Sequence, residues 1–455
     1  MISQSAILAV ASTFAAGAAA SGTATASKGP SKADMWNEDI TKWTLYCWAA
    51  IISALIIYRG GLFLARYIRT IACLNNDTQQ YFKLPNSTYG KIKRHLLDAP
   101  LIRTRHHREF HLSSALNMGV LPSRFQMSFL TGYLALNVTF CVFSIDWNNP
   151  TLATVSGQVR NRTGILATLN MIPLFLLAGR NNPLIKWTGI TFDTYNLIHR
   201  WIGRIVVLQA LAHTLAWMIP KVKAGGWDVV GKAMSSQFIY TGTIGTCALL
   251  AILIQSPSVI RHAFYETFLH VHIILAATAI AGIYMHLKEL PQLKMLQAVI
   301  AFWAFERGVR LCSLIYRNIG NGGTKAEVEV LPGDAVRVTM KVARPWRFQP
   351  GQHAYLYLPT VGMWTSHPFS CAWSELKDNN VNEKGLSLPG YGHDIESTRD
   401  TKEAVSFIIR RRTGFTEALY RKADAAPGGK FTTTAFVEGP YSKLASIPQS
   451  SRDHH

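Results

Sequence analysis

Charged residues are scarce in this sequence, and acidic residues are the scarcest. Only 16% of the 455 residues are charged, whereas 49% are hydrophobic. An ordinary soluble protein carries about 25% charged residues, so this composition argues against a purely soluble protein. The hydrophobic residues are gathered in runs of about 20, the length that crosses a hydrocarbon core roughly 30 Å thick. The composition therefore predicts a membrane protein.

The shortage of acidic residues leaves a net charge of +20, from 46 Lys and Arg against 26 Asp and Glu. Much of this excess lies in loops beside hydrophobic runs, as at residues 90–111. Basic loops next to transmembrane segments record topology more often than a polyanionic partner. We therefore expect membrane lipid, and not nucleic acid, to surround this protein.

Two sequence signatures are also missing. The six cysteines are scattered singly without a Cys-x-x-Cys pair, which argues against a disulfide framework and a cysteine-based zinc site. No Gly-x-Gly-x-x-Gly motif occurs, so the sequence shows no fingerprint of a Rossmann nucleotide-binding unit.

Seven hydrophobic runs are long enough to be transmembrane helices. They cover roughly residues 43–64, 127–147, 163–180, 195–219, 238–256, 264–287 and 294–314. The basic loop at 66–126 is expected on the cytoplasmic side by the positive-inside rule. Seven spans then place the N-terminus outside and everything after about residue 315 in the cytoplasm. The Ala-rich segment 1–30 is either a secretory signal peptide or a disordered leader.

Two of the expected spans each contain two histidines separated by 14 residues: His199 and His213, and His272 and His286. Ionisable residues inside a membrane are costly and are functional by default. At ~100° and ~1.5 Å per residue, 14 steps leave two side chains within about 40° of one another and about 21 Å apart. The two spans run in the same direction, because a single span separates them. His199 then faces His272, and His213 faces His286, as the two axial ligands of six-coordinate haem iron require.

Other roles are open to the membrane histidines and to the arginines beside them. Zinc or copper is the alternative metal, but it needs three or four ligands at one level. His270 points about 160° away from His272 and is expected to be a helix–helix or interfacial residue, as is His262. Arg200 and Arg204 either contact haem propionates or anchor the inner end of their span.

The character of the chain changes after about residue 323. Residues 326–343 alternate in places with a period of two, and segments of the same kind recur to about residue 445. Alternation of this type, punctuated by turn residues, is typical of strands. It predicts a small β-rich domain at 325–445 after the helical region at 127–316.

Two motifs in this domain suit a flat, phosphorylated ligand. One sets a hydroxyl beside an aromatic ring at a strand end and consists of His367, Pro368, Phe369 and Ser370. In the other, Gly414 and Thr416 come just before a plausible helix, whose free N–H groups form a seat for phosphate. Positive charge is added nearby by Arg410, Arg411 and Arg412.

Together these features resemble the ferric reductase family of fungal plasma membranes, relatives of the superoxide-producing NADPH oxidases. The resemblance runs from about residue 160 to 442. It rests on the ordered motifs HRWIGR…H, YETFLHVH…H, FERGVR, PGQH, HPFS, GFT and VEGPYS.

The resemblance implies an all-α membrane bundle of about seven transmembrane helices, with the span at 43–64 as an addition, followed by a cytoplasmic FAD-binding β-barrel of ferredoxin-reductase type. It implies that two b-type haems are held by His199, His213, His272 and His286. The HPFS element would position FAD with the Ser370 hydroxyl near the flavin ring. The region of Gly414 and Thr416 would hold the pyrophosphate. No catalytic residue is expected beyond these cofactor sites.

The implied activity is that of a ferric-chelate reductase, a multi-pass metalloreductase of iron uptake in the plasma membrane. Electrons would pass from cytoplasmic NADPH through FAD and two haems to an extracellular ferric or cupric chelate. Two alternatives stay open: a superoxide-generating NADPH oxidase, and a non-catalytic or partner-dependent membrane haem protein.

The sequence departs from the family pattern at its end. The family continues past GPYG into a nucleotide-binding lobe, whereas Ser442 replaces that glycine here and the chain stops after a tail at 446–455. We therefore expect the NADPH site to be absent from this chain. A separate NADPH-dependent reductase is then an alternative electron source.

Overall fold

The computed structural model describes residues 31–72, 87–97, 99–102, 109–111, 117–147, 150–320, 322–346, 349, 351–362, 365–377 and 402–441. The expected leader at 1–30, the tail at 446–455 and Ser442 lie outside the described residues. The chain divides into two units, residues 1–304 and 305–455. Each unit is described by itself.

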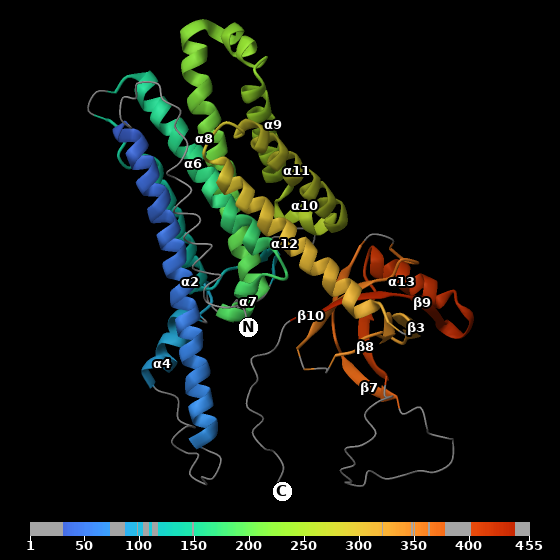
Figure 1. Ribbon diagram of the computed structural model, residues 1–455. Helices are drawn as coiled ribbons and strands as arrows, with labels where there is room; N and C mark the ends of the chain where they lie inside the picture. The colour runs from blue at the N-terminus through green and yellow to red at the C-terminus, as the bar shows by residue number, and fades with distance from the viewer. Residues whose placement is uncertain are drawn as a thin grey trace, which may run out of the picture. The chain divides into compact units, whose positions relative to one another are not determined.

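The first unit is helical (Figure 1). Its long helices are α2 (Lys32–Ala72), α5 (Arg124–Val142), α6 (Leu152–Ala178), α8 (Phe192–Ala233), α9 (Gln237–Gln255) and α11 (Tyr265–His286). Shorter elements are α4 (Ser87–Ile92), the π-helix η1 (Lys93–Leu97), β1 (Glu109–His111), β2 (Asn117–Val120), α7 (Pro183–Thr188) and α10 (Ser258–Ala263). Helix α12 (Leu293–Asn318) begins in this unit, and its residues from 305 onward belong to the second.

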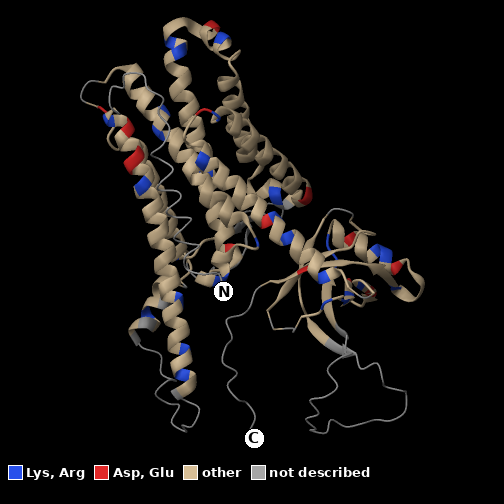
Figure 2. Ribbon diagram, in the orientation of Figure 1, with Lys and Arg blue, Asp and Glu red and all other residues tan. Residues whose placement is uncertain are grey.

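Five helices among the described residues are long and apolar enough to cross a membrane: α2, α5, α8, α9 and α11. Figure 2 shows the middle of α9 and α11 without charged residues. The expected spans at 163–180 and 294–314 also form helices, α6 and α12, but neither is among the five. Polar residues lower their hydropathy, such as Asn170 in α6 and Glu306 in α12. The fold is therefore a multi-pass helical region, and a total of seven spans stays a prediction.

Small residues allow the helices that carry the histidines to pack closely. Helix α6 packs along α8, and α9 packs along α11 (Figure 1). At the second contact, a Cβ added to Gly282 would lie 2.9 Å from the carbonyl oxygen of Thr241 and 3.0 Å from the backbone nitrogen of Gly245. Without a hydrophobic driving force between helices, such close backbone approach is a main source of packing energy in a bilayer.

A buried polar network joins α5, α6 and α8. The hydroxyl of Tyr133 donates to the side-chain oxygen of Asn170 at 2.6 Å. The amide of Asn170 donates in turn to Asn137 at 2.6 Å and to Gln209 at 3.0 Å. The Asn170 side chain is fully buried, and its hydrogen bonds remove the large cost of an unpaired polar group in an apolar interior. The network thus fixes how these three helices meet.

Arg162 closes the C-terminal end of α5. Its Nη1 donates to the carbonyl oxygens of Phe140 at 3.0 Å and Phe143 at 2.9 Å. Its Nε donates to Asn37 of α2 at 2.6 Å. Since the last carbonyls of a helix have no partner within the helix, Arg162 supplies donors that α5 itself lacks.

The second unit is the antiparallel β domain that the alternating sequence predicted. Its strands are β3 (Lys325–Leu331), β4 (Ala335–Lys341), β5 (His353–Tyr357), β6 (His367–Ser370), β7 (Trp373–Lys377), β8 (Lys402–Arg410), β9 (Lys430–Thr434) and β10 (Phe436–Tyr441). One sheet has the order β7-β8-β4-β3-β9, and the other has the order β10-β5-β6. Helix α13 (Phe415–Asp424) and the short 3₁₀ helix η2 (Pro427–Gly429) precede β9.

One hydrophobic core lies in this domain and receives residues from both sheets and from α13. Val328 of β3 and Val338 of β4 are fully buried, while their neighbours along each strand are more exposed. Leu356 of β5 and Leu419 of α13 complete the same core. The expected order, a membrane helical region followed by a β domain, is thereby confirmed at the level of its two parts.

Candidate cofactor sites

The structure brings the four membrane histidines together in the two pairs that their spacing predicted. The ring centroids of His199 and His272 are 6.4 Å apart, and those of His213 and His286 are 6.1 Å apart. Each pair joins α8 to α11. Because both helices are continuous between their histidines, the two pairs are separated by about 21 Å along the helix axes.

Three of the four imidazoles are held by a backbone carbonyl of a neighbouring helix. The Nδ1 of His199 contacts the Leu174 oxygen at 2.9 Å, and that of His213 contacts the Arg160 oxygen at 2.7 Å, both on α6. The Nδ1 of His286 contacts an oxygen of α9, that of Phe238, at 2.7 Å. A carbonyl can only accept, so Nδ1 carries the proton, and Nε2 keeps its lone pair. A neutral imidazole fixed in this way is prepared to bind a metal.

Two glycines leave space for the imidazole rings of the His213–His286 pair. A Cβ on Gly164 of α6 would lie 2.6 Å from Nδ1 of His213. A Cβ on Gly242 of α9 would lie 2.7 Å from Nδ1 of His286. Real Cβ atoms essentially never come so close, so both positions need glycine if the rings are to reach their carbonyls.

The spacing of the rings fits a six-coordinate iron. Two metal–nitrogen bonds of about 2 Å, with an imidazole radius of about 1.1 Å on each side, place two ring centroids roughly 6 Å apart. Both pairs match this separation. In the part of the chain that the structure describes, no group of three or more His, Cys, Asp or Glu residues gathers as a metal site. Two facing imidazoles at each level are the donor set that axial haem ligation requires, and the assignment to haem stays a prediction.

The neighbours of the histidine pairs lie as follows. His270 is exposed, and its Nδ1 contacts the Glu266 oxygen of its own helix at 2.8 Å, away from both pairs. The side chain of His262 is outside the described residues. The Nε of Arg200 is buried without a hydrogen-bond partner, whereas Arg204 is exposed and lies over the ring of Trp201. Their role toward haem propionates stays a prediction.

In the β domain, the HPFS strand has two different faces. Phe369 packs on the core, and the ring of His367 stacks on Phe415 of α13 at 4.3 Å. Pro368 and Ser370 are exposed on the opposite face, because successive side chains alternate across a strand. The aromatic ring beside the Ser370 hydroxyl is therefore not that of Phe369.

The face of this sheet that carries Pro368 and Ser370 has its own aromatic residues, half-buried or buried, which the sequence had not assigned to a site. His353 is the cross-strand partner of Ser370, and its ring stacks on Tyr441 at 5.8 Å. Tyr355, opposite Pro368, meets Tyr441 edge to face. The motifs PGQH and VEGPYS contain His353 and Tyr441, and His353 is the cross-strand partner of both Ser370 of β6 and Tyr441 of β10, so the register of β5 with these two strands was the signal that could have found them.

Glu438 of β10 holds this face together through several hydrogen bonds. It is fully buried and accepts from Nε of Arg310 at 2.8 Å, from the Tyr441 hydroxyl at 2.6 Å and from the Tyr357 hydroxyl at 3.2 Å. Arg310 belongs to the part of α12 that lies in this unit, and it also donates to Ser366 at 3.3 Å. A buried carboxylate needs such pairing, and here it ties α12 to strands β5 and β10.

The second expected motif forms the start of α13. Gly414 is its N-cap with φ +79°, and no side chain caps the helix. The Thr416 hydroxyl is engaged with the backbone of Arg412, accepting from its nitrogen at 2.9 Å and donating to its oxygen at 3.1 Å. The first-turn N–H groups therefore lack a side-chain partner, which is the arrangement that favours an anion.

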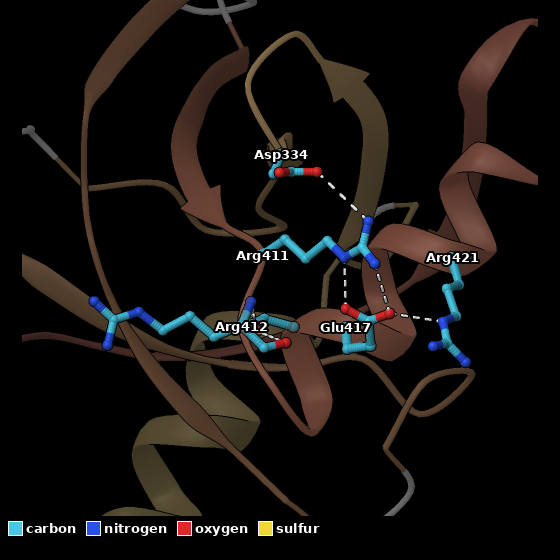
Figure 3. Close-up of polar contacts among 6 residues, drawn as sticks. Asp334, Arg411, Arg412, Glu417 and Arg421 are labelled. Atoms are coloured by element: carbon cyan, nitrogen blue, oxygen red, sulfur yellow. Dashed lines mark hydrogen bonds and ion pairs between the residues drawn. The ribbon is translucent and has the colours of Figure 1, made fainter. Parts of the chain in front are cut away.

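Of the arginines expected to add positive charge there, Arg411 is already paired (Figure 3). It donates to both carboxylate oxygens of Glu417, at 2.6 and 3.1 Å, and contacts Asp334 at 3.5 Å. The hydrogen bond from Arg411, with a further one from Arg421, lowers the pKa of Glu417. Arg412 points away from this cluster and is exposed (Figure 3).

The fold thus defines a multi-pass membrane protein with two facing histidine pairs and an antiparallel β domain. Comparison with known protein families shows which membrane proteins this chain is similar to. The family described as "Ferric reductase like transmembrane component" matches residues 163–283, and the FAD-binding domain family matches residues 321–382. The resemblance to the fungal ferric reductases, inferred from the sequence motifs, is confirmed by these matches.

Individual relatives agree. The chain is 26% identical to a ferric/cupric reductase transmembrane component of Saccharomyces cerevisiae, over 85% of the chain and 52% of that protein. It is 27% identical to one of Candida albicans, over 85% and 48%, and 29% identical to a probable cell surface ferric reductase of Aspergillus oryzae, over 69% and 39%. The chain spans about half the length of the curated relatives it matches.

Proposed function

We propose that this chain carries electrons across a membrane, from FAD in its β domain through two b-type haems to a ferric or cupric chelate on the opposite side. The observation that carries the proposal is the arrangement of the histidines: two pairs, about 21 Å apart, with three Nδ1 atoms held by carbonyls. A pair of axial imidazoles at two depths provides two redox centres in a layer that transports no charge readily.

The protein's part in this function is to hold and tune its cofactors. His199 and His272 bind one iron, and His213 and His286 bind the other. The glycines at 164 and 242 admit the rings of the second pair. Haem iron, when bound, passes one electron at a time, and FAD converts a two-electron donor into single transfers.

At the flavin end, the face of β5, β6 and β10 that carries Ser370 would receive the ring system. Ser370 offers its hydroxyl to the flavin edge, and His353 and Tyr441 lie on the same face. The start of α13 would hold the pyrophosphate, because no side chain caps its first-turn N–H groups after Gly414. NADPH is the expected ultimate donor.

The proposed setting is the plasma membrane, with the N-terminus outside and the β domain in the cytoplasm. The basic loop at 66–126 supports this orientation through the positive-inside rule. Outside, Lys221, Lys223 and Lys232 lie in the C-terminal part of α8, after His213, and suit an anionic chelate. Relatives named ferric/cupric reductase support a metal chelate as acceptor.

Electron transfer across vesicles tests the proposal. The whole chain is reconstituted with haem, ferric citrate and a ferrous-specific dye are enclosed, and chemically reduced FAD is supplied outside without oxygen. The proposal predicts ferrous dye complex inside at a rate well above that of His213→Ala vesicles. Equal rates would contradict it. Formation of the ferrous complex without oxygen would also exclude superoxide as an obligatory intermediate carrier.

A further inference from the structure

The helix pairs α6–α8 and α9–α11 repeat one arrangement, in which a carbonyl of the first helix accepts a hydrogen bond from a histidine of the second. On α6, the accepting carbonyls belong to Arg160 and Leu174. These two residues are 14 positions apart, as are the two histidines of α8 that they bind. On α9, Phe238 holds His286. The same step of 14 residues along α9 leads to Ile252, whose carbonyl is thus the register equivalent for His272.

Each accepting carbonyl is followed, four residues later, by a small residue. Gly164 follows Arg160, and Gly242 follows Phe238. Position i+4 covers the carbonyl of residue i in an α-helix, so a small residue there leaves that carbonyl open to a ring from a neighbouring helix. The equivalent residue after Leu174 is Ala178, which has no polar side-chain atom.

Position 256 breaks this pattern. Ser256 follows Ile252 by four residues, and its hydroxyl donates to the Ile252 carbonyl at 2.5 Å. His272 is at the same time the member of the four whose Nδ1 is buried without a hydrogen-bond partner. The oxygens of Arg160 and Phe238 also receive a hydroxyl, from Thr163 and Thr241, but only through longer contacts of 3.3 and 3.4 Å beside the imidazole. The much shorter bond of Ser256 therefore occupies the acceptor that the other copy of the arrangement gives to its histidine.

We propose that Ser256 is a positioning residue that makes the two haem irons unequal by taking the Ile252 carbonyl from His272. The inference rests on the proposed function, because it assumes iron between His199 and His272. An Nδ1–H that is hydrogen-bonded makes its imidazole a more basic ligand and fixes its ring. The His213–His286 iron has two such ligands, whereas the His199–His272 iron has one.

The consequence is a difference in midpoint potential. A more basic axial ligand favours the ferric iron over the ferrous iron, so hydrogen bonding to ligands lowers the potential. The hydroxyl of Ser256 therefore keeps the potential of the His199–His272 haem higher than a fully anchored pair would have. Electrons arriving from the flavin side are accepted more readily at that haem.

The test is a spectroscopic redox titration of the whole chain loaded with haem. Ser256→Ala frees the Ile252 carbonyl, so one haem should shift to a lower midpoint potential while the other stays unchanged. Ala178→Ser places a hydroxyl beside the Leu174 carbonyl and should shift the same haem upward. Ser256→Thr keeps the hydroxyl and should retain both wild-type potentials.

Failure of the proposed function and failure of the role of Ser256 give different results. A wild-type chain that binds no low-spin haem overturns the proposed function and this inference with it. A wild-type chain with two low-spin haems, whose potentials stay the same in both Ser256→Ala and Ala178→Ser, overturns the role of Ser256 alone. A shift confined to the His213–His286 haem, identified by its loss in His213→Ala, overturns it equally.

Discussion

Gly164 of α6 lies directly against the ring of His213, so that a methyl group in place of its hydrogen would sit 2.6 Å from the imidazole Nδ1. We predict that Gly164→Ala displaces the ring and loses the haem of that pair, lowering the haem content from two to about one per chain. Haem content is measured against protein by absorbance after extraction. Gly157→Ala is the matched control, because it lies on the same helix with nothing within 4 Å of its Cβ.

The Gly157→Ala control also distinguishes a steric clash with the ring from the effect of alanine on helix stability. Alanine favours a helix by up to about 1 kcal/mol over glycine, so both variants gain in the same way. Two haems in Gly164→Ala would show that the ring does not need this glycine.

A second prediction distinguishes neighbouring histidines on α11. His272→Ala should bind one haem, since a ligand is removed, whereas His270→Ala should keep two because its exposed ring contacts only its own helix. Absorbance of the reduced α-band measures both. Loss of haem in His270→Ala, with two haems kept in His272→Ala, would reverse the assignment.

The pairing of Arg310 with Glu438 should dominate the stability of the β domain. Removing one partner of a buried ion pair costs about 3–5 kcal/mol, because the other charge is left unpaired; since Arg310 is partly exposed, a value toward the lower end is expected. We predict earlier cleavage of the β domain in Arg310→Ala during heating with protease. Arg307→Ala is the control, because Arg307 lies on the same helix, its side chain is half-exposed, and its partner is the adjacent residue Glu306 and not a residue of the β strands.

The Arg411–Glu417 cluster gives a prediction about pH. Hydrogen bonds lower the pKa of Glu417 below its ordinary value of 4.5, so the folded state is stabilised above that value, and the contribution is lost as pH falls through the folded pKa. Thermal midpoints of the wild type and Glu417→Gln should therefore differ at pH 7 and converge as the pH falls below 4.5 and through the lowered pKa of Glu417. A constant difference across this range would contradict the pairing.

Cys371 provides a probe of the β-domain core. Burial raises the pKa of its thiol to about 11, so only about one molecule in a thousand carries the reactive thiolate at pH 8. Alkylation followed by mass spectrometry should find Cys371 protected in the native chain and modified after unfolding. Rapid modification of the native chain would mean that this core opens readily.

Much of the membrane site could be predicted from spacing alone. Fourteen residues return a helix to nearly the same face, so the pairing of His199 with His272 followed from periodicity. The hydrogen bond of His199 to Leu174 could not be foreseen, because backbone carbonyls carry no residue-specific signal and the register between helices is set by packing. Ser256 went unnoticed for the same reason.

The β domain shows the same division. Alternation predicted the strands, and HPFS marked the correct strand, but the face occupied by Phe369 depends on which side the core lies. The sequence suggested that Arg411 was available to bind phosphate, but its guanidinium is paired with Glu417, six residues later. The turn that brings these two side chains together could not be predicted from the sequence. Motifs located the segments, and packing decided what each side chain does.

The central claim is that this chain holds two bis-histidine haems. Electron paramagnetic resonance of the oxidised, haem-loaded chain tests it most directly. We predict low-spin signals that integrate to two haems per chain, of which His213→Ala and His272→Ala each remove a different one. A single low-spin haem, or the same signal lost in both variants, would contradict it.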